Sequence, residues 1–217
     1  KMLSRRNFIL GLLTSNLIFN QNSIVTGHQK TTNSGATKQY NGSKDILIIV
    51  DVQNDFCPGG ALAVPEGNQV VPVINQLINQ FDIVCASKDW HPTETIHFDR
   101  WPVHCVADSP GADFHPQLNL DSIDQILYKG TNNKDDGYSA FEATNMNLTQ
   151  WLKKKKVEEL TIVGLATDYC VKASALDAIN QGFKVVVHKK AVRAVNLDPN
   201  DGKNALLEMK QAGVEIV

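Results

Sequence analysis

The 217-residue sequence has few cysteines and lacks the glycine-rich loops that bind nucleotides. Four cysteines in a chain of this length are too few for a scaffold held together by disulfides. Neither a Gly-x-Gly-x-x-Gly fingerprint nor a Walker loop occurs, so dinucleotide and triphosphate binding lack their usual sequence support. With 42% hydrophobic and 20% charged residues, the composition is that of an ordinary globular protein.

Acidic residues are absent from positions 1–43, although five basic residues lie there. Of the 21 lysines and arginines, 16 therefore remain for positions 44–217, against 23 acidic residues and a formal charge of −7. A nucleic-acid-binding surface needs clustered lysines and arginines, so we expect no nucleic-acid partner. The contrast between the two parts predicts that they serve different purposes.

The acid-free head has the layout of a secretory signal over residues 1–27. Arg5 and Arg6 precede a moderately apolar stretch that ends at Phe19, and the pair resembles the twin-arginine export motif. This stretch is too short and too interrupted to span a bilayer, so we expect no stable membrane insertion after signal removal. Residues 28–43 have the composition of a flexible linker. The prediction is export to the periplasm, and a cytoplasmic protein with a frayed extension is the alternative.

From residue 44 onward, apolar runs alternate with amphipathic segments. Runs rich in β-branched residues predict strands over 46–50, 82–87, 125–128, 160–164, 183–188 and 214–217. Helical periodicity predicts helices over 66–81, 148–156, 169–181 and 199–212. This alternation predicts one α/β domain over 44–217, a three-layer α/β/α arrangement in which helices cover both faces of a six-stranded parallel sheet. Ligands of such sheets bind outside the carboxyl ends of the strands.

Three reactive side chains stand at predicted strand ends: Asp51, Lys129 and Cys170, the last at the entry of a helix. A helix N-terminus or a nearby cation lowers a thiol pKa, so Lys129 is expected to favour the thiolate. Asp51 could take the thiol proton and deliver it to a leaving amine, while the N–H groups of Ala166 and Cys170 hold an oxyanion. Alternatively, each residue alone has a structural explanation as a cap, a surface lysine or a buried thiol.

A second group combines histidines with a carboxylate. Asp89 and His91 are two positions apart and project to one side of an extended segment, and His97 and His104 follow within the same loop. Imidazole and carboxylate ligands suit Zn²⁺, Mn²⁺ or Fe²⁺. These four residues are the predicted metal ligands. The alternative is a loop whose histidines hydrogen-bond to the backbone.

Three aromatic residues lie near these groups in the sequence: Phe56, Trp101 and Tyr138. A small flat substrate could stack among them. Loop-anchoring aromatic side chains are the alternative explanation. His115 and His188 are expected to be structural, in a loop and at a strand end respectively.

The motifs around these residues resemble those of nicotinamidases within the isochorismatase-like cysteine hydrolase superfamily. The matching segments are DVQNDFCPGG (51–60), SKDWH (87–91), WPVHC (101–105), GADFHP (111–116), YKG (128–130), YSAF (138–141) and VGLATDYC (163–170). These segments are spread over 51–170, and the resemblance as a whole extends over essentially all of 45–217. The metal-binding histidine set separates nicotinamidases from relatives such as carbamoyl-amide hydrolases, which have the acid, lysine and thiol without it.

The resemblance implies the strand order 3-2-1-4-5-6 and a cis peptide between Leu165 and Ala166. It implies hydrolysis of nicotinamide to nicotinate and ammonia through a thioester on Cys170, with pyrazinamide as a further substrate. Phe56 and Trp101 would sandwich the pyridine ring. One divalent ion, zinc foremost with iron or manganese as alternatives, would bind the ring nitrogen.

Two other functions stay open at this point. One is a related cysteine hydrolase acting on another small amide or carbamoyl compound, and the other is an exported metal-binding protein. The second is disfavoured because metal capture needs no thiol, lysine and carboxylate at three strand ends. Disulfides among Cys57, Cys85 and Cys105 and the oligomeric state, including a homo-oligomer, also stay open.

Overall fold

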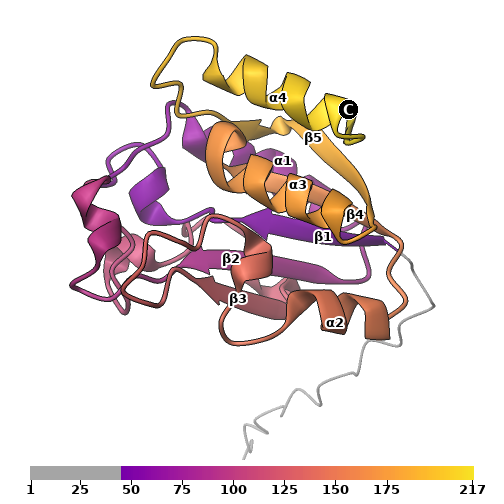
Figure 1. The fold of residues 1–217 in the computed structure, drawn as a ribbon, viewed down its shortest axis with the longest axis horizontal. Helices are drawn as coiled ribbons and strands as arrows, with labels where there is room; N and C mark the ends of the chain where they lie inside the picture. The colour runs from indigo at the N-terminus through magenta and orange to yellow at the C-terminus, as the bar shows by residue number, and fades with distance from the viewer. Residues whose placement is uncertain (1–44) are drawn as a thin grey trace, which may run out of the picture. The chain divides into compact units, whose positions relative to one another are not determined.

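A computed structural model describes residues 45–217, so the predicted signal segment (1–27) and linker (28–43) lie outside the described residues (Figure 1). The described part contains one parallel sheet of six strands in the order β3-β2-β1-β4-β5-β6. The strands are β1 (Asp45–Val50), β2 (Val84–Asp89), β3 (Gln125–Lys129), β4 (Glu159–Leu165), β5 (Lys184–Arg193) and β6 (Glu215–Ile216). The predicted parallel sheet and the strand order implied by the resemblance are both confirmed.

Helices cover both faces of this sheet (Figure 1). They are α1 (Val70–Ile78), α2 (Leu148–Lys154), α3 (Lys172–Asn180) and α4 (Asp201–Gln211). Because successive side chains of a strand point to opposite faces, β1 contributes to two cores. Ile46 and Ile48 pack in the core that includes residues of α2, α3 and α4, whereas Leu47 and Ile49 pack with those of α1. The three-layer α/β/α prediction is therefore confirmed. Among the described residues, no helix is long and apolar enough to cross a membrane.

Several predicted boundaries differ from the structure. The predicted helix over 66–81 is shorter, because a 3₁₀ turn at Gly67–Gln69 precedes α1. The predicted helix over 169–181 begins as a π-helical turn, Thr167–Val171, that leads into α3. The second strand lies two residues later than predicted, which places Asp89 inside β2.

The prediction of a strand over 183–188 was wrong at its carboxyl end. A register shift between Ile162 and Gly164 of β4 lets β5 resume its pairing as far as Arg193. His188 therefore lies inside β5 and not at a strand end. The polar lysines that follow His188 concealed this continuation, because they break the apolar run on which the prediction rested.

Gly164 allows β4 to approach β1 closely near the carboxyl ends of both strands. Gly164 has a φ of 113°, and a Cβ at this position would overlap the Val50 carbonyl oxygen. Only glycine combines this backbone conformation with such a close approach. The end of β1 therefore lies directly beside the β4 terminus, from which Ala166 and the turn carrying Cys170 continue.

Candidate active site

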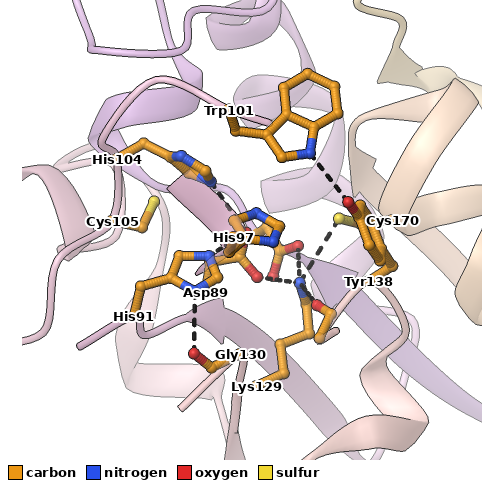
Figure 2. Close-up of polar contacts among 12 residues, drawn as sticks. Asp89, His91, His97, Trp101, His104, Cys105, Lys129, Gly130, Tyr138 and Cys170 are labelled. Carbon is orange, nitrogen blue, oxygen red and sulfur yellow. Dashed lines mark hydrogen bonds and ion pairs between the residues drawn. The ribbon is translucent and has the colours of Figure 1, made fainter. Parts of the chain in front are cut away.

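Lys129 lies at the centre of the site and is completely buried. Its Nζ is 2.7 Å from Asp51 Oδ2, forms an ion pair with Asp89 and donates to the Gly137 carbonyl oxygen at 2.7 Å. The same nitrogen is 3.6 Å from Cys170 Sγ (Figure 2). The carboxyl ends of β1, β2 and β3 and the turn after β4 thus bring the predicted acid, amine and thiol together.

Charge balance around Lys129 keeps its amine protonated. Burial by itself would lower the amine's pKa, but Asp51 and Asp89 outweigh burial and hold the Lys129 pKa well above its usual value. For Asp89, burial raises the carboxyl pKa, but Lys129 and the neighbouring histidines lower it more. The Asp89 pKa is therefore well below its usual value. Two carboxylates on one ammonium leave the cluster with a net negative charge.

Asp51 is held in a strained conformation with an elevated proton affinity. Its φ of 49° lies in the left-handed region, which non-glycine residues adopt uncommonly. The Ser87 hydroxyl donates to Asp51 Oδ1 at 2.7 Å. Burial raises the pKa of Asp51 to about 6 against the opposing attraction of Lys129, and Asp89 raises it further. A carboxylate with such a pKa suits proton transfer near neutral pH.

The Cys170 thiol differs from the sequence-based expectation. Burial raises its pKa well above the usual value, and the opposing effect of Lys129 is too small to reverse this. Lys129 does lower the Cys170 pKa, as expected, but burial outweighs its effect, so the resting thiol is protonated. The sequence did not reveal how deeply the thiol is buried. A protonated thiol needs a base, and acceptor atoms of Asp51, Asp89 and Cys170 lie within 4.8 Å of one another.

The turn that carries Cys170 begins at Ala166. The Leu165–Ala166 peptide is cis, as the resemblance implied. The Ala166 carbonyl oxygen accepts from the N–H groups of Tyr169 and Val171, both at 3.1 Å. Ala166 and Cys170 both line the pocket described below.

The three predicted histidine ligands form a second cluster beside the first (Figure 2). One side-chain nitrogen from each of His91, His97 and His104 lies within 4.8 Å of the other two. The His91 and His97 rings stack with centroids 4.4 Å apart. All three side chains are buried. Asp89 lies between the clusters, with Oδ2 3.6 Å from His91 Nε2 and 3.7 Å from His104 Nε2.

The hydrogen bonds of these histidines fit a metal site. Nδ1 of His91 bonds to the Gly130 carbonyl oxygen at 3.0 Å, and Nδ1 of His104 bonds to the Pro102 carbonyl oxygen at 2.7 Å. A carbonyl partner fixes the proton on Nδ1 and leaves the lone pair on Nε2. His91 Nε2 is buried and has no hydrogen-bond partner among residues 45–217. Nitrogen and carboxylate donors in this arrangement suit a divalent transition-metal ion, with zinc the commonest match.

One pocket opens onto both clusters and encloses about 440 Å³, including its mouth. The three predicted aromatic residues line it, together with Asp89, His97, His104 and Cys170. Trp101 Nε1 donates to the Tyr138 hydroxyl at 3.0 Å, which joins two sides of the pocket. Five further lining residues were not predicted from the sequence: Leu62, Val64, Gly137, Tyr169 and Val195.

Three polar residues that organise the site were also missed. The Gln53 side chain accepts a hydrogen bond from the Asp89 N–H at 2.8 Å and donates one to the Asp89 carbonyl oxygen at 2.8 Å. This pair of bonds fixes the end of β2. Ser87 orients Asp51, and Asp135 contacts His97. Gln53 and Ser87 lie within the matching motifs, which was the only available signal for them. Asp135 lies outside every motif.

The four cysteines, all within the described residues, are free. Cys57, Cys85 and Cys105 therefore form no disulfides with one another. Burial raises the pKa of Cys57 to about 11 and that of Cys85 to about 12, so neither is reactive.

Comparison with known proteins shows the family to which this domain belongs. The isochorismatase domain model matches residues 45–217. Escherichia coli nicotinamidase is 41% identical over 197 residues, covering 78% of this chain and 92% of that protein. The nicotinamidase/pyrazinamidase of Mycobacterium tuberculosis is 40% identical over 184 residues, covering 79% and 97% respectively. The crystal structure of Pyrococcus horikoshii pyrazinamidase in complex with zinc superimposes with a TM-score of 0.73 at 42% identity, covering 80% of this chain and 98% of that one.

The match extends over the whole described domain, and the reactive residues fall at the strand ends of the family's sheet. The chain belongs to the isochorismatase family.

Proposed function

We propose that this chain hydrolyses nicotinamide to nicotinate and ammonia through a thioester on Cys170. One observation carries the proposal: a single aromatic-lined pocket places the Asp51–Lys129–Cys170 cluster next to three convergent histidines. Relatives that share about two-fifths of its residues are named nicotinamidases, and one of them also pyrazinamidase. Pyrazinamide, a similar flat ring with a carboxamide, is a second expected substrate.

Substrate binding uses the aromatic walls of the pocket. Phe56 and Trp101 would sandwich the pyridine ring, with Tyr138 beside it. His91, His97, His104 and Asp89 would hold a divalent ion, zinc foremost and iron or manganese as alternatives. When bound, that ion would supply a fixed Lewis-acidic centre for the ring nitrogen. The carboxamide, two ring positions from that nitrogen, would then face the thiol.

Formation of the thioester begins with proton transfer from Cys170 to Asp51. The thiolate attacks the carboxamide carbon, and the N–H groups of Ala166 and Cys170 hold the developing oxyanion. Asp51 then returns the proton to the leaving nitrogen, and ammonia departs as the C–N bond breaks. Lys129 remains positively charged throughout and offsets the negative charge on Asp51 and the sulfur.

Hydrolysis of the thioester repeats the same proton path in reverse. Asp51, again ionised, takes a proton from water as the water oxygen attacks the thioester carbon. The tetrahedral species collapses to nicotinic acid and releases the sulfur, which recovers its proton from Asp51. The acid then loses its remaining proton to solvent and leaves as nicotinate. The Asp51 pKa of about 6 allows both directions of transfer near neutral pH.

The proposal is tested by measuring ammonia release from nicotinamide by the purified protein, with metal content determined on the same sample. Cys170→Ala should abolish turnover and leave bound metal unchanged. Cys57→Ala is the matched control, because Cys57 is buried and lies outside the pocket lining. A wild-type protein that releases no ammonia from nicotinamide, yet turns over another small amide or carbamoyl compound, would overturn the proposed substrate.

A further inference from the structure

Asp135 is an acidic residue to which neither the sequence motifs nor the proposed reaction assigns a role. It lies on the loop between β3 and the 3₁₀ turn Ala140–Glu142, and its side chain is 30% exposed. Its Oδ1 lies 3.1 Å from His97 Nδ1 and accepts from the Tyr138 hydroxyl at 3.0 Å. Its Oδ2 lies 3.1 Å from the Arg100 guanidinium. One carboxylate therefore contacts three side chains around the pocket mouth.

The contact with His97 differs from those of the other two histidines. His91 and His104 bond to backbone carbonyl oxygens, whereas Nδ1 of His97 has a carboxylate as its partner. A carboxylate fixes the proton on Nδ1, directs the Nε2 lone pair into the cluster and makes that nitrogen a stronger donor. Asp135 is thus placed to control the orientation of His97.

The contact with Tyr138 links the same carboxylate to the aromatic wall. Tyr138 donates to Asp135 and accepts from Trp101 Nε1, so a continuous chain of hydrogen bonds runs from the indole to the carboxylate. Figure 2 shows this bond from Trp101 to Tyr138, which lies to the right of the three histidines in the view. The loop holding Asp135 therefore joins one histidine to two side chains that line the pocket.

We infer that Asp135 is a positioning residue that holds His97 in its metal-binding orientation and ties it to the Tyr138–Trp101 wall. The inference relies on the proposed function only for the assignment of His97 as a metal ligand. Loss of an outer partner of a metal-bound histidine typically weakens metal binding ~10–100-fold. Because Asp135 is partly exposed to solvent, we expect the lower end of that range, about tenfold.

The test measures zinc affinity by competition with a chelator of known affinity, so it does not depend on turnover. Asp135→Ala should weaken zinc binding about tenfold, and Asp135→Asn, which retains an acceptor oxygen, should weaken it less. Asp136→Ala is the matched control: the neighbouring side chain carries the same charge and makes no hydrogen bond or ion pair with residues 45–217. Circular dichroism of each variant verifies that it is folded.

A double-mutant cycle then shows whether Asp135 acts through His97. In the His97→Ala background, Asp135→Ala should cause no further loss of zinc affinity, because its target is gone. An Asp135→Ala protein that binds zinc as tightly as wild type would overturn the inference, and so would an equal loss with and without His97. A wild-type protein that binds zinc but does not hydrolyse nicotinamide would refute the proposed function alone.

Discussion

Replacing Lys129 by methionine should destabilise the protein strongly, because this lysine neutralises two buried carboxylates. Its Nζ is 2.7 Å from Asp51 Oδ2 and is also paired with Asp89. Both acidic side chains are almost fully buried. Removing one partner of a buried ion pair typically costs about 3–5 kcal/mol, since the remaining charge has no compensation. For a domain of this size, that corresponds to a fall in melting temperature of roughly 6–20 °C.

The pH dependence of this loss follows from the same charges. Without the ammonium, burial and mutual repulsion raise the folded-state pKa of Asp51 or Asp89 above its value of about 4 in the unfolded chain. Between pH 5 and 7 the folded variant then binds more protons than the unfolded chain does. Its stability therefore rises as the pH falls through this window. The difference in melting temperature between variant and wild type should shrink from pH 8 to pH 5.

Thermal unfolding at several pH values, at one fixed zinc concentration, measures both effects. Lys88→Met is the matched control, because Lys88 is also a buried lysine of the sheet but its carboxylate partner, Asp113, is mostly exposed. It should cost less than Lys129→Met. Adding Asp51→Asn to Lys129→Met should restore part of the stability. A Lys129→Met protein that melts like wild type, or with a deficit that does not change with pH, would show that Lys129 does not neutralise the two buried carboxylates.

Three further predictions concern activity, backbone and export. The kcat/KM for nicotinamide should fall as the pH drops through about 6, because Asp51 must be ionised to accept the thiol proton; a profile that stays flat down to pH 5 would contradict this role. Gly164→Ala should lower the free energy of unfolding by more than about 2 kcal/mol. Gly182→Ala should lower it by only about 1 kcal/mol, because Gly182 has a φ of 90° but no atom lies within 4 Å of the added Cβ. Equal losses of the two variants in chemical denaturation would show that the close approach at Gly164 has no energetic cost. Residues 2–43 fused to a reporter should carry it across the membrane, and replacing both arginines of the twin pair by lysine should stop export; a cytoplasmic reporter would reject the localisation.

The fold and the reactive residues were accessible from the sequence because they depend on local patterns. Buried parallel strands appear as continuous apolar runs, and their carboxyl ends meet at one edge of the sheet. Asp51, Lys129 and Cys170 could therefore be grouped from their positions at the ends of predicted strands. The strand order, in contrast, came only from the family resemblance, because apolar runs do not show which strands pair.

The features that were missed depend on contacts between distant segments. Asp135 meets His97 only because two loops that are far apart in the sequence come together at the pocket, and no periodicity signals such a contact. The continuation of β5 depends on a register shift against β4, which the sequence of β5 alone does not encode. The direction of the Cys170 pKa depends on how far burial outweighs Lys129, a balance set by packing.

Trapping the thioester would show whether Cys170 is the nucleophile. The protein is mixed with nicotinamide, quenched in acid during turnover, and analysed by mass spectrometry as intact protein and as peptides. We expect an added mass equal to one nicotinoyl group, located on Cys170 and absent from Cys170→Ala. Ammonia release by Cys170→Ala at the wild-type rate, or a nicotinoyl group on any other residue, would contradict this role of Cys170.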